Sequence, residues 1–216
     1  GNAANNGFAI EGFTGLRLIE TTADNAHLRL AQTSLNPYGT GTAWAYFPST
    51  LSSGGDVWFS TVRYDYTAPR AGNYAHLTML HEIGHALGLD HAHSAGAFGA
   101  VPAAYDAMEY TLMTYRSYVG GPLNGYTNET WGYAQSYMML DIAALQHLYG
   151  ADFTTNAGDT IYSWTPGSGI TSVDGRNAIN PGANRIFTTV WDGGGIDTYD
   201  LSAYATDLAI DLAPGA

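Results

Sequence analysis

The residues with the clearest chemistry lie at 81–91, where three histidines, a glutamate and a glycine occur at fixed spacings. This stretch reads H-E-x-x-H-x-x-G-x-x-H. On a helix, His81 and His85 are about one turn apart and project from nearly the same side, so two imidazoles can bind one ion. Gly88 can adopt a positive φ and end the helix, which would let His91 turn back as a third ligand. The pattern predicts a zinc site with its fourth position open.

Glu82 has the position expected of a general base beside such an ion. It directly follows the first histidine, so its side chain leaves the helix to one side of the two ligands. From there a carboxylate can reach a water molecule at the metal without binding the ion itself. The alternative is a helix that merely carries histidines, because a bare H-E-x-x-H also occurs by chance. The glycine and the third histidine favour the zinc site, since all of these residues would otherwise have to coincide.

A second group of candidate site residues lies beyond the third histidine, in the run Leu-Met-Thr-Tyr at 112–115. A methionine beside a tyrosine usually indicates core packing. The extended zinc motif, however, is followed by a turn with a methionine beneath the metal, and Met113 fits that position with Met108 as its competitor. Tyr115 could place its phenol near the metal, as a zinc ligand or as a donor to an oxyanion.

The composition restricts both the partners and the chemistry. The chain has 216 residues, of which 45% are hydrophobic, enough for one sizeable domain and a smaller appendage. Its net charge of −12 argues against nucleic acid as a partner. It contains no cysteine, which excludes disulfides, thiolate ligands and a cysteine nucleophile. It has no apolar run of about 18 residues, so no membrane association is expected.

Three short strands are expected before the zinc motif. Alternation and aromatic content predict them at 27–32, 42–47 and 57–62, separated by turn residues. In the first of these, Leu28 and Leu30 alternate with polar or small residues, which predicts a half-buried strand.

Two helices are expected to frame the site. Asn73 could cap a helix at 74–87 that carries the zinc motif. A second apolar stripe predicts a helix at 138–149, with Ser136 as a possible cap and Gly150 as its end.

The remaining segments are less regular. Residues 1–9 have no periodicity and are expected to form a loose terminus. Residues 92–135 contain no clear regular element, although their aromatic residues favour an ordered segment. After residue 150 the composition shifts to Gly, Asp, Thr and Asn with short apolar pairs, which predicts a separate β-rich region.

These motifs together resemble the metzincin metalloproteases and, among them, the serralysins. The resemblance is carried by the zinc helix, the turn at 113–115 and the segments at 141–150 and 191–198, which occur in serralysin order. It implies an α+β fold in which a metzincin-like catalytic domain has a twisted mixed β-sheet, an active-site helix and a C-terminal helix. That domain is expected at 1–150, followed at 151–216 by a short β-rich, calcium-binding segment, the truncated start of a β-roll.

Asp192 and Asp197 flank three consecutive glycines, so carbonyl and carboxylate oxygens could converge there on one cation. From the residues alone, an ordinary acidic turn is the simpler interpretation. The serralysin resemblance implies a structural calcium site instead, completed by carbonyls from a preceding segment. The residues that it implies are Asn156, Gly158, Thr160, Asp192, Gly194, Gly195 and Asp197.

The resemblance also implies an activity, that of a secreted zinc endopeptidase. Glu82 would serve as the base for the attacking water, and Tyr115 would be a fifth zinc ligand that swings away when substrate binds. The segment at 42–46 resembles the edge strand that pairs with an extended substrate. The candidate substrate contacts are therefore Thr42, Ala43, Trp44, Ala45 and Tyr46. Expected partners are extended polypeptides and a proteinaceous inhibitor, and the chain is expected to be an extracellular monomer.

Some features depart from the family pattern. Ala92 stands where serralysins usually carry proline, and the extra His93 that follows is more often a solvated loop residue than a ligand. The family's long opening helix is not recognisable before Gly15. Two other functions stay open: a metal-binding module without activity, and a calcium-dependent extracellular structural or adhesive module based on residues 150–216.

Overall fold

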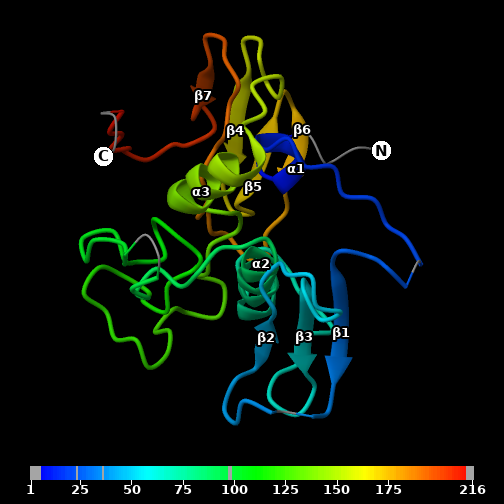
Figure 1. Cartoon of the computed structure of the whole chain (residues 1–216). Coiled ribbons are helices and arrows are strands. Elements are labelled where there is room, and N and C mark those ends of the chain that lie inside the picture. Colours follow the sequence, from blue (N-terminus) through cyan, green and yellow to red (C-terminus); the bar gives the residue numbers. More distant parts are fainter. Residues whose placement is uncertain (1–5, 23, 36, 97–98, 213–216) are drawn as a thin grey trace.

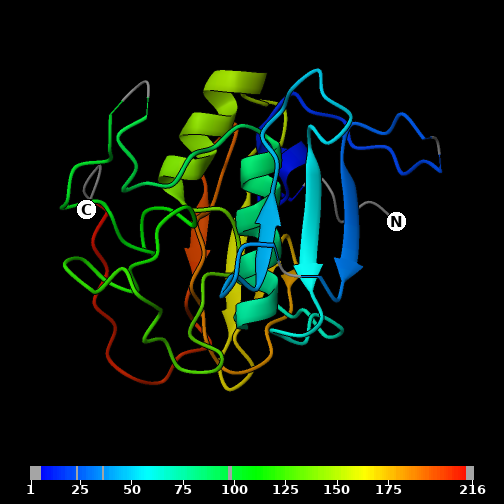
Figure 2. The same ribbon diagram turned by 60° about the horizontal axis from the view of Figure 1, so that its bottom comes forward.

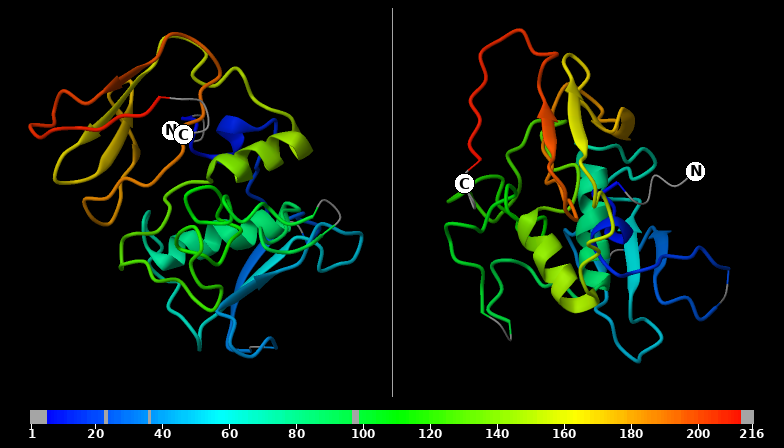
Figure 3. Two further views of the ribbon diagram at one scale, coloured as in Figure 1. Left: turned by 90° about the vertical axis from the view of Figure 1, so that its left-hand side faces the viewer. Right: turned by 90° about the horizontal axis from the view of Figure 1, so that it is seen from above.

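The protein is arranged around helix α2, Tyr74–Ala86, which carries the zinc motif. In this computed structural model, residues 6–22, 24–35, 37–96 and 99–212 are described. A three-stranded sheet lies on one side of α2, while helix α3 and a four-stranded sheet lie on the other (Figure 1). Figure 3 shows the same order of layers from two further directions. The predicted α+β class with a mixed sheet is confirmed.

The first sheet consists of β1 (Arg29–Thr33), β2 (Ala43–Ala45) and β3 (Asp56–Ser60) in the order β1-β3-β2. β1 is parallel to the central strand β3, and β2 is antiparallel to it. All three predicted strands are present, although their ends differ slightly. Val57 and Phe59 are buried on the face that packs against α2.

The prediction of a half-buried first strand is wrong for Leu30, which is 49% exposed. The reason is topological, because β1 is an edge strand and α2 packs mainly against β2 and β3. Leu28, just before the strand, does pack against the core. Leu30 therefore lies beyond the area that the helix covers.

Helix α2 begins and ends as its sequence predicts. The Oδ1 atom of Asn73 accepts a hydrogen bond from the backbone N–H of His76 at 2.9 Å, which caps the first turn. At the other end the backbone N–H of Leu89 donates to the carbonyl of Gly84 at 2.9 Å. Gly88 has φ +105°, a conformation that only glycine adopts without strain. The chain therefore reverses directly after the helix.

Helix α3, Met139–Tyr149, confirms the second predicted helix, and Gly150 ends it with φ +81°. The proposed cap at Ser136 is wrong. Its hydroxyl lies 2.6 Å from the hydroxyl of Thr188, whereas the carboxylate of Asp141 accepts from the backbone N–H of Met138 at 2.9 Å. A first-turn carboxylate thus replaces the expected serine. No helix within the described ranges has the length and apolar character needed to cross a membrane.

The β-rich region predicted after residue 150 is present as a second sheet. Its strands follow the order β6-β5-β4-β7, with β7 parallel to β4 and the other neighbours antiparallel. The strands are β4 Ile161–Thr165, β5 Ile170–Val173, β6 Arg176–Ile179 and β7 Thr198–Asp200.

The N-terminal segment packs against this C-terminal region. Phe8 is buried and clusters with Tyr162 and Val173, so the predicted loose terminus is wrong for residues 6–9, while residues 1–5 lie outside the described part. The four-residue helix α1, Ile10–Phe13, follows. The sequence prediction rested on the polar residues of this stretch. Burial of the apolar side chains of Phe8 and Ile10 stabilises the packed arrangement instead.

The long segment between α2 and α3 contains no helix or strand among its described residues, as predicted, and forms an irregular lobe beside the two helices (Figure 2). Asp141 of α3 anchors this segment by hydrogen bonds. Its buried carboxylate accepts from the hydroxyl of Thr111 at 2.6 Å and from the backbone N–H of Leu112 at 2.8 Å. Burial raises the pKa of Asp141 to about 6, and these hydrogen bonds oppose the increase.

Replacing Asp141 by alanine is expected to lower the free energy of unfolding by about 3 kcal/mol or more, because three buried donors lose their acceptor. Asp141→Asn should cost less, since a carboxamide oxygen still accepts from a backbone N–H. Urea denaturation followed by circular dichroism measures both changes. The exposed Asp207→Ala is the control and should change the free energy by less than about 0.5 kcal/mol. Equal stability of the two alanine variants would contradict the anchoring role.

Candidate metal centre and active site

The three histidines predicted as ligands converge on one point. The Nε2 atom of His91 lies 3.2 Å from Nε2 of His81 and 3.0 Å from Nε2 of His85. Candidate ligand atoms of all three residues lie within 4.8 Å of one another. Two of these residues project from α2, and the reversal at Gly88 brings the third alongside them.

Backbone carbonyls orient the two helical histidines. Nδ1 of His81 lies 2.7 Å from the carbonyl oxygen of Leu112, and Nδ1 of His85 lies 2.7 Å from that of Leu89. Because a carbonyl only accepts, each Nδ1 carries the proton and each Nε2 lone pair points at the shared centre. This second layer of hydrogen bonds is typical of metal-binding histidines.

The charge state of the histidines also suits a cation. Burial lowers the pKa of His81 well below its ordinary value and lowers the pKa of His85. Burial, followed by the neighbouring His85, lowers the pKa of His91 to about 4. All three rings are therefore neutral near pH 7, and three neutral imidazoles directed at one point match the ligand set of a catalytic zinc ion.

Met113 lies beneath the metal-binding helix. A β-carbon at Gly84, between the two helical histidines, would lie 2.8 Å from the Met113 sulfur, so the methionine side chain packs closely against this part of the helix. Met108 is also buried, but its sulfur accepts from the side-chain amide of Asn128 at 3.6 Å. Of the two candidate methionines, Met113 is therefore the one against the zinc helix.

Tyr115 places its phenol at the same centre. Its hydroxyl oxygen lies 2.8 Å from Nε2 of His91, and its ring stacks near that of His81 with centroids 5.8 Å apart. Burial, and then the charge of Glu82, raises the pKa of Tyr115 to about 12. Without a cation the phenol is therefore neutral and can donate a hydrogen bond.

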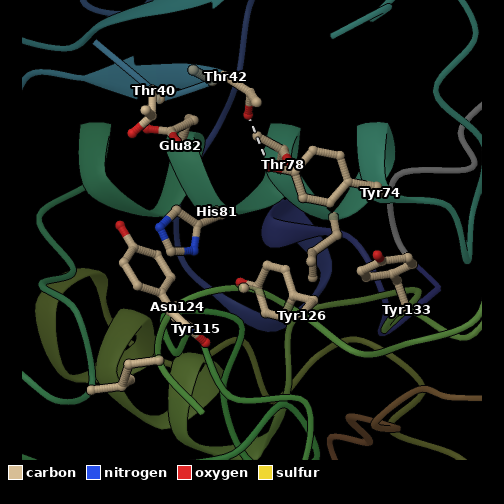
Figure 4. A pocket seen from close by; sticks show the side chains of 15 residues that line it. Thr40, Thr42, Tyr74, Thr78, His81, Glu82, Tyr115, Asn124, Tyr126 and Tyr133 are labelled. Atoms are coloured by element: carbon tan, nitrogen blue, oxygen red, sulfur yellow. Dashed lines mark hydrogen bonds between the residues drawn. The ribbon is translucent and has the colours of Figure 1, made fainter. Parts of the chain in front are cut away.

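Glu82 lines a cleft of about 490 Å³ together with His81 and Tyr115. Figure 4 shows these three side chains at one end of the cleft, Tyr74 and Tyr133 at the other, and Tyr126 between them. Glu82 is only 7% exposed, and burial raises its pKa to about 8. A divalent cation on the histidines would oppose this increase and favour the carboxylate. The position of Glu82 suits a group that exchanges protons inside the cleft.

The candidate substrate strand β2 forms the edge of its sheet and part of the cleft wall. The carbonyl of Thr42 and the N–H of Tyr46 both bond to β3, so by antiparallel alternation the peptide groups of Ala43 and Ala45 point away from the sheet. Thr42 and Ala43 line the cleft. The ring of Trp44 instead stacks on Trp58, and Trp44 and Tyr46 line a separate cavity.

The residues of the candidate calcium site are also brought together. The Oδ1 atom of Asp197 accepts from the N–H of Thr160 at 3.0 Å, and the Thr160 hydroxyl donates to the carbonyl of Gly158 at 2.9 Å. A β-carbon at Gly195 would lie 2.4 Å from that carbonyl oxygen.

The Oδ1 atom of Asp192 accepts from the N–H of Gly194 at 2.8 Å. Asn156, with φ +51°, presents its carbonyl to the Thr160 hydroxyl at 3.4 Å. Hard oxygen ligands of this kind suit calcium.

The two departures after the third histidine have structural consequences. The N–H of Ala92 donates to the carbonyl of Met113 at 2.9 Å, a bond that proline could not make. His93 is half-buried rather than solvated, and its ring stacks on His91 with centroids 5.2 Å apart and an interplanar angle of 10°. The sequence did not predict this contact, because it depends on the course of an irregular loop.

Sequence reasoning also missed the buried carboxylate of Asp106. It accepts hydrogen bonds from the Thr114 hydroxyl and, at 2.9 Å, from Nε of Arg116, on the two sides of Tyr115. The only signal in the sequence was an aspartate in a segment with few charged residues, and such carboxylates are usually solvated.

Comparison with known proteins gives consistent matches. A model of the matrixin type of peptidase M10 matches residues 27–111, and one described as the peptidase M10 serralysin C terminal matches residues 151–216. The chain is 39% identical over 193 residues to serralysin of Proteus mirabilis and 36% identical over 187 residues to serralysin C of Dickeya chrysanthemi. It is 36% identical over 183 residues to metalloprotease AprA of Pseudomonas entomophila. These alignments cover 80–83% of this chain and 37% of each relative, so the chain spans well under half of their length.

The histidine geometry predicts one tight zinc site per chain. His85→Ala is expected to weaken zinc binding by about 100-fold or more, because two imidazoles cannot complete the ligand set. Competition with a chromophoric chelator measures the dissociation constant. His147→Ala, which removes an exposed histidine of α3, should leave it unchanged. Equal affinity of the two variants would mean that the triad does not hold the ion.

Proposed function

Because this chain belongs to the serralysin-type metzincins, we propose that it is a secreted zinc endopeptidase that cleaves peptide bonds in extended polypeptides. The observation that carries the proposal is the meeting of three histidine Nε2 atoms beside a cleft that His81, Glu82 and Tyr115 line. In the same proposal, residues 1–150 form the catalytic domain and residues 151–216 a calcium-binding β-rich segment. The proposed form is a monomer, with a proteinaceous inhibitor as a further partner.

His81, His85 and His91 would hold the zinc ion, with Tyr115 as an additional ligand. Zinc bound there supplies Lewis-acid chemistry: it makes water more acidic and polarises a carbonyl oxygen. The carbonyls of Leu112 and Leu89 keep two of the imidazoles in the tautomer that leaves Nε2 free. The protein therefore supplies the ligand geometry in advance.

Glu82 is proposed to move the protons of the reaction. It accepts a proton from the water that attacks the scissile carbonyl carbon and delivers it to the amine nitrogen as the C–N bond breaks. The Tyr115 phenol donates to the oxyanion that forms on the carbonyl oxygen. The burial of the Glu82 side chain in the cleft supports this role, because a carboxylate with little access to bulk water exchanges its proton with the reacting groups beside it.

The edge of β2 is proposed to hold the substrate backbone. The free peptide groups of Ala43 and Ala45 can pair with an extended chain, which adds a strand to the sheet along the cleft. Backbone pairing of this kind is independent of side chains, so it favours extended polypeptides as a class. Successive side chains of such a substrate would point to opposite faces of the extended sheet, so every second side chain could face the cleft.

Glu82→Gln is expected to lower the rate of casein hydrolysis by at least about 100-fold while the zinc content stays the same, because glutamine cannot accept the proton. Casein hydrolysis by the unmodified protein should stop when o-phenanthroline chelates the zinc ion. Glu109→Gln changes an exposed glutamate and should keep the full rate. Near-normal hydrolysis by zinc-loaded Glu82→Gln would rule out this mechanism.

The calcium site makes a separate prediction about stability. Excess calcium is expected to raise the melting temperature by about 5 to 10 °C, since a ligand that binds only the folded state stabilises it. Asp192→Asn should lose most of this increase, whereas Asp207→Asn should retain it. Differential scanning calorimetry with calcium or with a calcium chelator gives the measurement. An identical calcium response in both variants would exclude the Asp192 loop as the site.

A further inference from the structure

Tyr115 is flanked on both sides by residues that bind one buried carboxylate. The hydroxyl of Thr114 donates to Oδ1 of Asp106, and Nε of Arg116 donates to Oδ2 at 2.9 Å. Asp106 is only 4% exposed, so the ion pair with Arg116 is shielded from solvent on the carboxylate side. One side chain thus restrains the residues before and after the phenol-bearing position.

Backbone hydrogen bonds complete this restraint. The carbonyl of Arg116 accepts from the N–H of Met108 at 3.0 Å, and the N–H of Arg116 donates to the Thr114 hydroxyl at 3.0 Å. Rotation of the backbone at Tyr115 would break one or more of these bonds. The 2.8 Å approach of the Tyr115 hydroxyl to His91 therefore depends on a turn that is fixed at both ends.

The same residues connect Tyr115 to the wall of the cleft. An Nη1 hydrogen of Arg116 is donated to the carbonyl of Gly121, and the hydroxyl of Tyr126 donates to the carbonyl of Thr114 at 2.7 Å. Residues 123–126 line the cleft opposite β2. The cleft wall and the Tyr115 phenol are therefore both held by the residues around the Asp106–Arg116 ion pair. No helix or strand supports the described residues of this segment.

We propose that Asp106 and Arg116 are positioning residues that hold the Tyr115 phenol at the metal-binding histidines and tie it to the cleft wall. The expected effect on catalysis rests on the proposed function. The expected effect on the position of the phenol is independent of that function. A carboxylate with two differently placed acceptor oxygens suits this task, because it fixes two donors relative to each other. An ion pair that served stability alone would have no need to bracket the tyrosine.

Arg116→Gln and Asp106→Asn remove the ion pair without a large change in shape. The first readout uses protein loaded with Cu²⁺ in place of zinc, in which a coordinated phenolate gives a charge-transfer band in the visible spectrum. Tyr115→Phe defines the spectrum without this band. Both ion-pair variants are expected to lose at least about half of the band, since small displacements remove the phenol from the ion. Arg116→Lys keeps the charge and should retain more of the band than Arg116→Gln.

The second readout is peptide hydrolysis by the zinc-loaded proteins. Loss of phenol positioning is expected to lower kcat by about tenfold and to change KM by less than about twofold, because the oxyanion contact forms mainly in the transition state. A general loss of stability would instead lower the amount of folded enzyme without changing the spectrum per bound copper ion. Circular dichroism and metal content report that amount for each variant.

Arg29→Gln is a closely matched control. Nε of Arg29 donates to Asp56 at 2.6 Å and its Nη2 to the carbonyl of Ser52, the same two kinds of contact that Arg116 makes. This pair lies on the three-stranded sheet, away from the phenol, and its removal should leave both the band and kcat unchanged.

The outcomes separate the two proposals. If Arg116→Gln and Asp106→Asn match Arg29→Gln in spectrum and kcat, or if the unmodified protein lacks the copper band, the positioning role is wrong. If the band behaves as expected but the zinc-loaded unmodified protein does not cleave peptides, the positioning role stands and the proposed protease function fails. Where Asp106→Asn does not fold, Arg116→Gln, whose residue is partly exposed, decides the question alone.

Discussion

The structure depends on the requirement that three imidazole nitrogens meet at one point, within 4.8 Å of one another, although they come from different kinds of backbone. Helix geometry alone aligns His81 and His85, which are neighbours on one face. His91 reaches the same point only because Gly88 adopts φ +105° and the chain turns back. Neutral, closely spaced nitrogens have no mutual attraction, so their arrangement must be imposed by the surroundings. The helix, its termination and the loop beyond it all serve this one constraint.

Most of the contacts that hold the three histidines in this arrangement come from residues outside the motif. The carbonyl of Leu112 fixes one histidine, and Met113 lies against the glycine between the two helical ligands. Both residues belong to a segment without helix or strand in its described part, so its position cannot come from repeated backbone bonds. Two buried carboxylates act instead: Asp141 accepts from Leu112 and its neighbour, and Asp106 accepts on both sides of Tyr115. Irregular backbone is acceptable in the interior where such side chains satisfy its donors.

This division explains what the sequence could predict. The zinc motif, the Asn73 cap and the end of α2 at Gly88 depend on residues within one or two turns, and their patterns were sufficient. Ser136 was misassigned because its hydroxyl bonds to Thr188, a residue 52 positions away. The exposure of Leu30 and the contact between His93 and His91 likewise depend on which distant element lies alongside. Local propensity carries no information about such partners.

The β-rich region also bears on the site, because it is hydrogen-bonded to the part of the chain that precedes α3. The N–H of Gln135 donates to the carbonyl of Phe187 at 2.8 Å, and the hydroxyl of Ser136 meets that of Thr188 just before α3 begins. From the opposite end of the chain, Phe8 is buried beside Tyr162. Unfolding of the second sheet would therefore expose the start of α3, whose Asp141 holds the segment beneath the histidines. A cation that stabilises this sheet would stabilise the zinc site by the same linkage, without contacting it.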